Sequence, residues 1–225
     1  SGATINVDAD EVDHLLADET AGRLTISDQV ITVTNAITVD QANLLGATTT
    51  GVVTATIATT ETVTELATLN ADGGTNALTV VVRAADATGA TAAQLNTIND
   101  ATSVAVDLTN VTALAGSSLS DLGTLATAIT NNEFSNDTGL TTIAVTDTTI
   151  DATTLAARID SYDTINGSST TGMTLVSGAT INVDADEVDH LLADETASRL
   201  TITDQVITVT NAITVDQANL LGATT

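Results

Sequence analysis

One stretch of this chain occurs twice, and that recurrence limits the possible folds more than any other feature. Residues Ser1–Thr49 return as Ser177–Thr225, at an offset of 176 residues. Only two positions differ between the copies, with Gly22 corresponding to Ser198 and Ser27 to Thr203. Near-identity over this length is typical of tandem arrays, in which each repeat buries its apolar face against its neighbours.

The recurrence also sets the expected domain organisation. We expect residues 1–225 to form one continuous repeat array. Within it, residues 1–176 would be one full long-period unit, and residues 177–225 would begin the next unit as a near copy of residues 1–49. We further expect the chain to be a fragment of a longer array.

A shorter and less regular period lies inside the long one. Leucines recur at the centres of helix-like segments, at spacings of 22 to 36 residues. These leucines are Leu15, Leu44, Leu66, Leu95, Leu125, Leu155 and Leu191. The long unit therefore divides into six short repeats of about 29 residues, a period typical of solenoids.

Apolar residues spaced three or four apart predict the helices, and β-branched runs predict the strands. The predicted helices are Ala9–Asp18, Gln41–Leu45, Glu61–Leu69, Thr91–Ile98, Leu119–Ile129, Ala152–Ile159, Ala185–Asp194 and Gln217–Leu221. The predicted strands are Leu24–Ser27, Ile31–Thr34, Val52–Ile57, Leu78–Val82, Val104–Thr109, Thr142–Thr146 and Leu200–Thr203, with short second strands at Ile5–Val7, Ile37–Val39 and Ile181–Val183.

Each short repeat thus has the order strand, turn, short strand, helix. Because a crossover through a helix joins parallel strands, the expected fold is an elongated α/β solenoid with parallel β-sheet. A leucine-rich-repeat-like horseshoe is the alternative, since Val104–Asn110 weakly matches the pattern of that repeat.

Composition excludes several functions. The chain carries 29 acidic and 4 basic side chains, a net charge of −25, and it has no Cys. Thiolate metal sites need Cys, and nucleic-acid binding needs a basic surface, so neither is expected. No apolar run reaches the ~18 residues of a membrane span. Aromatic residues make up only 1%, which indicates a thin core of small aliphatic side chains.

One acidic cluster is the candidate metal site. Carboxylates that start a helix cap its free N–H groups, yet the same oxygens are the ligands that Ca²⁺ prefers. The candidate Ca²⁺ ligands are Asp8, Asp10, Glu11 and Asp13, with the second copy at Asp184, Asp186, Glu187 and Asp189. The cluster lacks the ligand order of an EF-hand loop, so a capped, solvated helix face is the competing interpretation.

Nothing in the sequence predicts catalysis. Glu11 and His14 have the spacing of a di-iron helix, but the only other histidine is the copy at His190. The chain has no Cys, Lys or G-x-S-x-G motif, so we expect no enzyme and no cofactor other than Ca²⁺. Pairs such as Thr32 and Thr34 place two threonines on one strand face, which leaves an ice-binding solenoid as a remote alternative.

Phrases such as Ile37–Leu45, in a composition rich in Thr, Ala, Asp and Val, resemble the giant tandem-repeat surface proteins of marine bacteria. The closest likeness is to those that serve non-flagellar swimming in marine cyanobacteria. This resemblance implies a secreted, extracellular structural protein of the cell surface, with a role in motility or adhesion. Its implied partners are neighbouring repeats of the same parent chain and cell-envelope polysaccharide. An adhesin module that binds Ca²⁺ or glycans is the alternative function.

Overall fold

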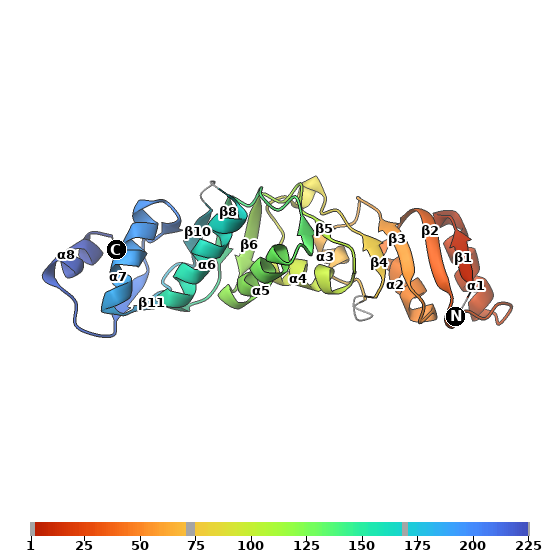
Figure 1. Ribbon diagram of the computed structural model, residues 1–225, viewed down its shortest axis with the longest axis horizontal. Helices are drawn as coiled ribbons and strands as arrows, with labels where there is room; N and C mark the ends of the chain where they lie inside the picture. The colour runs from red at the N-terminus through yellow and green to blue at the C-terminus, as the bar shows by residue number, and fades with distance from the viewer. Residues whose placement is uncertain (1–2, 71–74, 168–170, 225) are drawn as a thin grey trace. The chain divides into compact units, whose positions relative to one another are not determined.

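The computed structural model describes residues 3–70, 75–167 and 171–224 as an α/β protein with parallel sheets (Figure 1). The chain divides into two compact units, each made of segments from different parts of the sequence. Unit 1 comprises Ser1–Ala87, Gln94–Asn110 and Asn131–Asn136, and unit 2 comprises Thr88–Ala93, Val111–Thr130 and Asp137–Thr225. The prediction of one continuous array, with a boundary after residue 176, stays a prediction.

The main sheet of unit 1 has four parallel strands that stand side by side in chain order (Figure 1). They are β1 (Thr4–Val7), β2 (Val30–Ile37), β3 (Val53–Ile57) and β4 (Ala77–Thr79). β2 changes register against β3 between Thr32 and Ala36. A second pair of short parallel strands, β5 (Val106–Asp107) and β7 (Phe134–Ser135), completes the strands described in this unit.

Helices connect these strands. The structure has α1 (Ala9–Thr20), α2 (Val39–Thr48), α3 (Val63–Leu66), the 3₁₀ helix η1 (Ala84–Asp86) and α4 (Ala92–Asp100), whose first two residues belong to unit 2. α1 and α2 pack against each other and against the strands β2 and β3. Asp8, Thr38 and Thr62 cap α1, α2 and α3 through capping boxes, because each accepts a bond from the third helical N–H while that residue's side chain bonds back.

Unit 2 contains two parallel sheets. From Thr142 onwards the strands alternate between the sheets, so a first strand joins one sheet and the strand after the turn joins the other. One sheet has the order β12 (Leu200–Thr201), β10 (Gly172–Leu175), β8 (Thr142–Val145), β6 (Ala113–Ser117), and the other has the order β13 (Val206–Val209), β11 (Thr180–Val183), β9 (Thr149–Asp151). This alternation matches the predicted order of strand, turn, short strand and helix.

The helices of unit 2 pack on one another in chain order, α5 on α6, α6 on α7 and α7 on α8. They are α5 (Leu119–Thr130), α6 (Ala152–Ile165), α7 (Ala185–Thr196) and α8 (Val215–Thr224). The core is made mostly of Val, Ile, Leu and Ala. Tyr162 of α6 is fully buried, and its hydroxyl donates to the carbonyl oxygen of Leu122 in α5 at 3.1 Å. Burial raises the pKa of this phenol.

The two copies of the 49-residue stretch share the pairing of one strand pair and the bounds of both helices. Thr4 pairs with Val30 in the first copy, and Thr180 pairs with Val206 in the second, with the next three residue pairs also in identical register. α1 and α7 have corresponding bounds, as do α2 and α8. These helices and this strand pair therefore form in both surroundings, whereas the strands differ in extent, since β2 runs to Ile37 but β13 ends at Val209.

The eight predicted helices are confirmed in position, although most extend beyond their predicted ends. Two predicted strands are wrong. Ile37–Val39 is no separate strand, because β2 continues to Ile37 and α2 begins at Val39 after its cap Thr38. Leu24–Ser27 forms no strand, whereas its second copy forms β12 against β10. The reason is a missing neighbour, since no described strand lies beside Leu24, which is 38% exposed while Leu200 is 2% exposed. No described helix is both long enough and apolar enough to cross a membrane.

Candidate functional site

The acidic cluster of the first copy lies at the start of α1, where most of its carboxylates are already hydrogen-bonded. Asp8 accepts from the backbone N–H of Glu11 at 3.0 Å, and Glu11 accepts from that of Asp8 at 3.1 Å. Asp13 accepts from the side-chain amide of Gln41 at 3.1 Å. Asp10 has an exposed side chain. Three of the four carboxylates therefore stabilise the helix and its contact with α2.

The second copy repeats this arrangement at the start of α7. Asp184 accepts from the backbone N–H groups of Asp186 and Glu187 at 2.9 and 3.2 Å, and Asp189 accepts from Gln217 at 3.3 Å. Among the residues that the structure describes, no three Asp, Glu or His side chains gather in an arrangement that could hold a metal ion. The Ca²⁺ interpretation stays a prediction, with Asp10 and Asp186 as the carboxylates left most open to solvent.

The two histidines have different surroundings. His14 lies on the exposed face of α1, while His190 lines a groove between α6 and α7 with a volume of about 290 Å³. Its apolar lining residues include Leu155, Ala156 and Leu191. Its acidic lining residues are Asp160, Glu187 and Asp194.

An arginine neutralises one end of this groove. Arg199 forms ion pairs with Asp194, with Asp163 at 2.9 Å and with Asp160 at 3.6 Å. Burial raises the pKa of Asp194, although Arg199 acts in the opposite direction, and the bond to Asp163 raises the pKa of Arg199. The cluster holds the end of α7 against α6, and its one cation is already shared among three carboxylates.

A second set of polar side chains recurs along the chain and links elements that are distant in sequence. In each case the first backbone N–H of a helix donates to a side chain located 22 to 28 residues later, near the end of a following strand. We call these side chains distal caps. They are Glu61 on Val39, Asp86 on Val63, Ser117 on Ala92, Asp147 on Leu119 and Asn211 on Ala185.

The distal caps complement the ordinary N-caps. At α2, α3 and α7 a capping box satisfies the third helical N–H, whereas the distal cap takes the first, so two free donors of the same helix end are bonded. The distances from the helix N–H are 2.7 Å to Asp86 and to Asp147, 2.9 Å to Ser117 and 2.6 Å to Asn211. Each helix is thereby tied to the strand and turn that follow it.

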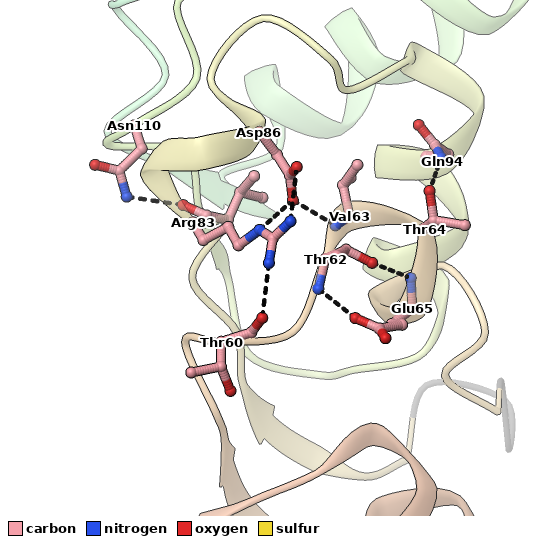
Figure 2. A network of polar contacts seen from close by, with 10 residues as sticks. Thr60, Thr62, Val63, Thr64, Glu65, Arg83, Asp86, Gln94 and Asn110 are labelled. Carbon is pink, nitrogen blue, oxygen red and sulfur yellow. Dashed lines mark hydrogen bonds and ion pairs between the residues drawn. The ribbon is translucent and has the colours of Figure 1, made fainter.

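Figure 2 shows the most extended of these networks, at the start of α3. Asp86 accepts from the N–H of Val63 and also from Nε of Arg83 at 2.9 Å. Arg83 in turn donates to the carbonyl oxygen of Thr60 at 2.9 Å. The capping box of Thr62 and Glu65 lies beside it, and the bonds to Thr62 lower the pKa of Glu65. These groups satisfy one another's hydrogen bonds and so stabilise the start of α3.

The distal caps were not predicted from the sequence. Asp147 and Asn211 each accept from the first N–H of a helix that begins more than 25 residues earlier. Asn110 likewise donates to the carbonyl oxygen of Val82 at 2.8 Å. The available signal was positional: an Asp, Asn, Glu or Ser recurs about 25 residues after most helix starts.

The threonine rows on the sheet of unit 1 are short. Thr32 lies beside Thr54, but the next position in that row is Ala77. Thr56 lies between Ala36 and Thr79. Neither of these two rows places more than two threonines side by side.

Comparison with known proteins found no matching family model, no matching curated protein and no matching solved structure.

Proposed function

We propose that this chain is a structural repeat segment of a large secreted bacterial cell-surface protein, serving as a spacer, stalk or coat array in motility or adhesion. The finer fold belongs to the same proposal: successive strand–turn–strand–helix elements would continue as one α/β solenoid. A leucine-rich-repeat-like horseshoe remains the alternative shape.

One observation carries the proposal: the polar side chains that join distant parts of the chain tie each element to the next. The distal caps bond five of the eight α-helices that the structure describes to residues 22 to 28 positions later. Polar residues that bond each helix to the element after it suit a protein that must be long and must resist unfolding. The repeated 49 residues support this, because they fold with the same register in both units.

An adhesin module that binds Ca²⁺ or glycans is the second candidate. The exposed Asp10 and Asp186 favour the ion, since a carboxylate that is free of protein hydrogen bonds keeps its lone pairs for a ligand. Partners on this interpretation would be cell-envelope polysaccharide as well as neighbouring repeats, and the protein would act outside the cell. A glycan array separates the two candidates, because a passive spacer binds none of the sugars.

Small-angle scattering tests the proposed shape. A compact globule of 225 residues has a radius of gyration of about 17 Å. The solenoid predicts a clearly larger value and a distance distribution with a long tail. A radius near that of the globule contradicts the solenoid, and turnover in a broad hydrolase screen contradicts a purely structural role.

A further inference from the structure

The C-terminal part of the chain carries an exposed surface. The residues of identical sequence in the first copy are buried. This surface, the β13–α8 face, consists of the outer edge of β13 and the adjoining side of α8. It is hollowed, with a volume of about 390 Å³, and lined mainly by apolar side chains. Its lining residues Ile207 and Ala218 enter the argument, together with Val215, which is exposed at the start of α8.

The first copy shows the same surface covered. Val39 is 3% exposed, but its counterpart Val215 is 76% exposed. Ile31 and Ala42 are buried as well, while their counterparts Ile207 and Ala218 are partly or fully exposed. Since sequence and register are the same in both copies, the difference comes only from what lies against the face.

In the first copy that neighbour is Thr49–Asn70, which contains β3 and α3. β3 pairs in parallel with β2, and Ile31 donates to the carbonyl oxygen of Val52 at 3.0 Å. Its inward side chains Val53, Ala55 and Ile57 are all at most 4% exposed.

Two polar contacts and one glycine make the fit specific. Glu61 accepts from the first N–H of α2, at Val39. The Asn43 amide bonds both ways, donating to the carbonyl oxygen of Thr68 at 2.9 Å and accepting from the N–H of Asn70 at 2.8 Å. A Cβ on Gly51 would meet the carbonyl oxygen of Gln29 far inside van der Waals contact, so this position needs glycine.

We infer that the β13–α8 face is a docking surface for a strand–turn–helix element with the features of Thr49–Asn70. Its occupant supplies a strand with small or branched apolar residues at alternate positions, a glycine at its approach, and a carboxylate four residues beyond its end. Val215 N–H and the Asn219 side chain are the groups that these features would engage. This inference rests on the proposed repeat-segment function and names the partner of one of its surfaces.

The test extends the full chain at Thr225 with a copy of residues 50–70 and follows amide hydrogen exchange by NMR. Docking in register slows exchange of the Ile207 and Val215 amides at least about tenfold relative to the unextended chain. The amides of Ile31 and Val39, whose sequence surroundings are the same, serve as protected references in the same molecule. A matched extension that carries Gly51→Ala in the appended copy should leave Ile207 and Val215 exchanging as in the unextended chain.

Three results would overturn the inference. The first is unchanged exchange at Ile207 and Val215 in the extended chain while Ile31 and Val39 stay protected. The second is equal protection by the Gly51→Ala extension, which would show that contact there is not specific. The third is protection of Ile207 in the unextended chain as its concentration rises, which would identify a second copy as the occupant. Scattering tests the proposed shape independently, so failure of either proposal is recognised separately.

Discussion

Gly22 and its counterpart Ser198 place two different residues at the same helix end in the two copies. Both follow a helix and both adopt the left-handed conformation, with φ of 67° at Gly22 and 60° at Ser198. The N–H groups of these two residues donate to the carbonyl oxygens of Glu19 and Glu195. The N–H groups of the residues that follow them donate to the carbonyl oxygens of Asp18 and Asp194, so each copy has a Schellman motif. The second copy therefore keeps the same helix end at the cost of a strained serine.

Ser198→Gly should raise the free energy of unfolding of the chain by about 1 kcal/mol, because glycine enters the left-handed region without steric penalty. Gly22→Ser should lower it by a similar amount. Urea unfolding followed by circular dichroism measures both. Equal stability of all three proteins would show that the serine hydroxyl compensates for the backbone strain.

At the scale of elements, helices were easier to predict than strands, for a physical reason. A capping box and an apolar stripe, as at Asp8 and Val12, are local features that a short window of sequence contains. Leu24 and Leu200 stand in nearly the same local sequence, yet only Leu200 lies in a strand, since β10 pairs with it. Strand formation depends on a partner that a local pattern does not specify.

The candidate site was predictable to a similar degree. The carboxylates at Asp8 and Glu11 were recognised as a capping box, and the structure confirms it. The distal caps and the Arg199 cluster were missed, because each joins residues more than 20 positions apart or in different helices. Only the three-dimensional structure brings such pairs together.

Asp147→Ala should destabilise the protein by about 1 kcal/mol, the usual effect of removing a helix cap. The N–H of Leu119 loses its acceptor, which now lies 2.7 Å away, and exchange of this amide should accelerate. Asp147→Asn is the matched control, because its amide oxygen still accepts the bond. If both variants unfold at the urea concentration of the parent chain, the distal cap adds nothing to stability.

At the scale of the whole molecule, stability should rise as the pH falls from 7.5 towards 5. Burial raises the pKa of Asp194, Asp137 and Glu61, so the folded state binds protons more tightly than the unfolded state in this window. Stability from these groups therefore increases as pH falls through their raised folded pKa values, down to the unfolded values near 4. The lowered pKa of Glu65 acts in the opposite direction.

Calorimetry across this pH range measures the effect as an increase in Tm. Glu61→Gln keeps an acceptor for the N–H of Val39 but removes one titrating group, so its Tm should depend less on pH. If Tm falls as the pH is lowered from 7.5 to 5, the stability lost with hydrogen bonds to carboxylates exceeds the stability gained from reduced repulsion.

Salt should also stabilise the chain. With a net charge of −25, its acidic side chains repel one another in dilute buffer. The distance over which such repulsion acts shrinks to about 3 Å at 1 M salt. Tm should therefore rise with NaCl. If Ca²⁺ binds the acidic clusters, millimolar Ca²⁺ at constant ionic strength raises Tm further, by mass action.

The double variant Asp10→Asn and Asp186→Asn is the control for the ion. It should keep the response to NaCl and lose the additional response to Ca²⁺. If this variant still responds to Ca²⁺, the ion binds at other carboxylates. If the parent chain does not respond to Ca²⁺, the prediction of Ca²⁺ binding is wrong.

The two copies of one face give the chain a choice of neighbour while it folds. Thr49–Asn70 has the right contacts for β2 and α2, and equally for β13 and α8. Contact chemistry cannot discriminate between them, but connectivity does: closing a loop of about 20 residues costs about 2 kcal/mol less than closing one of about 155. At high concentration a second molecule removes that advantage, and strand exchange between chains becomes the competing route. In a protein with nearly identical tandem sequence, the order of the elements along the chain therefore helps to determine which of them pair.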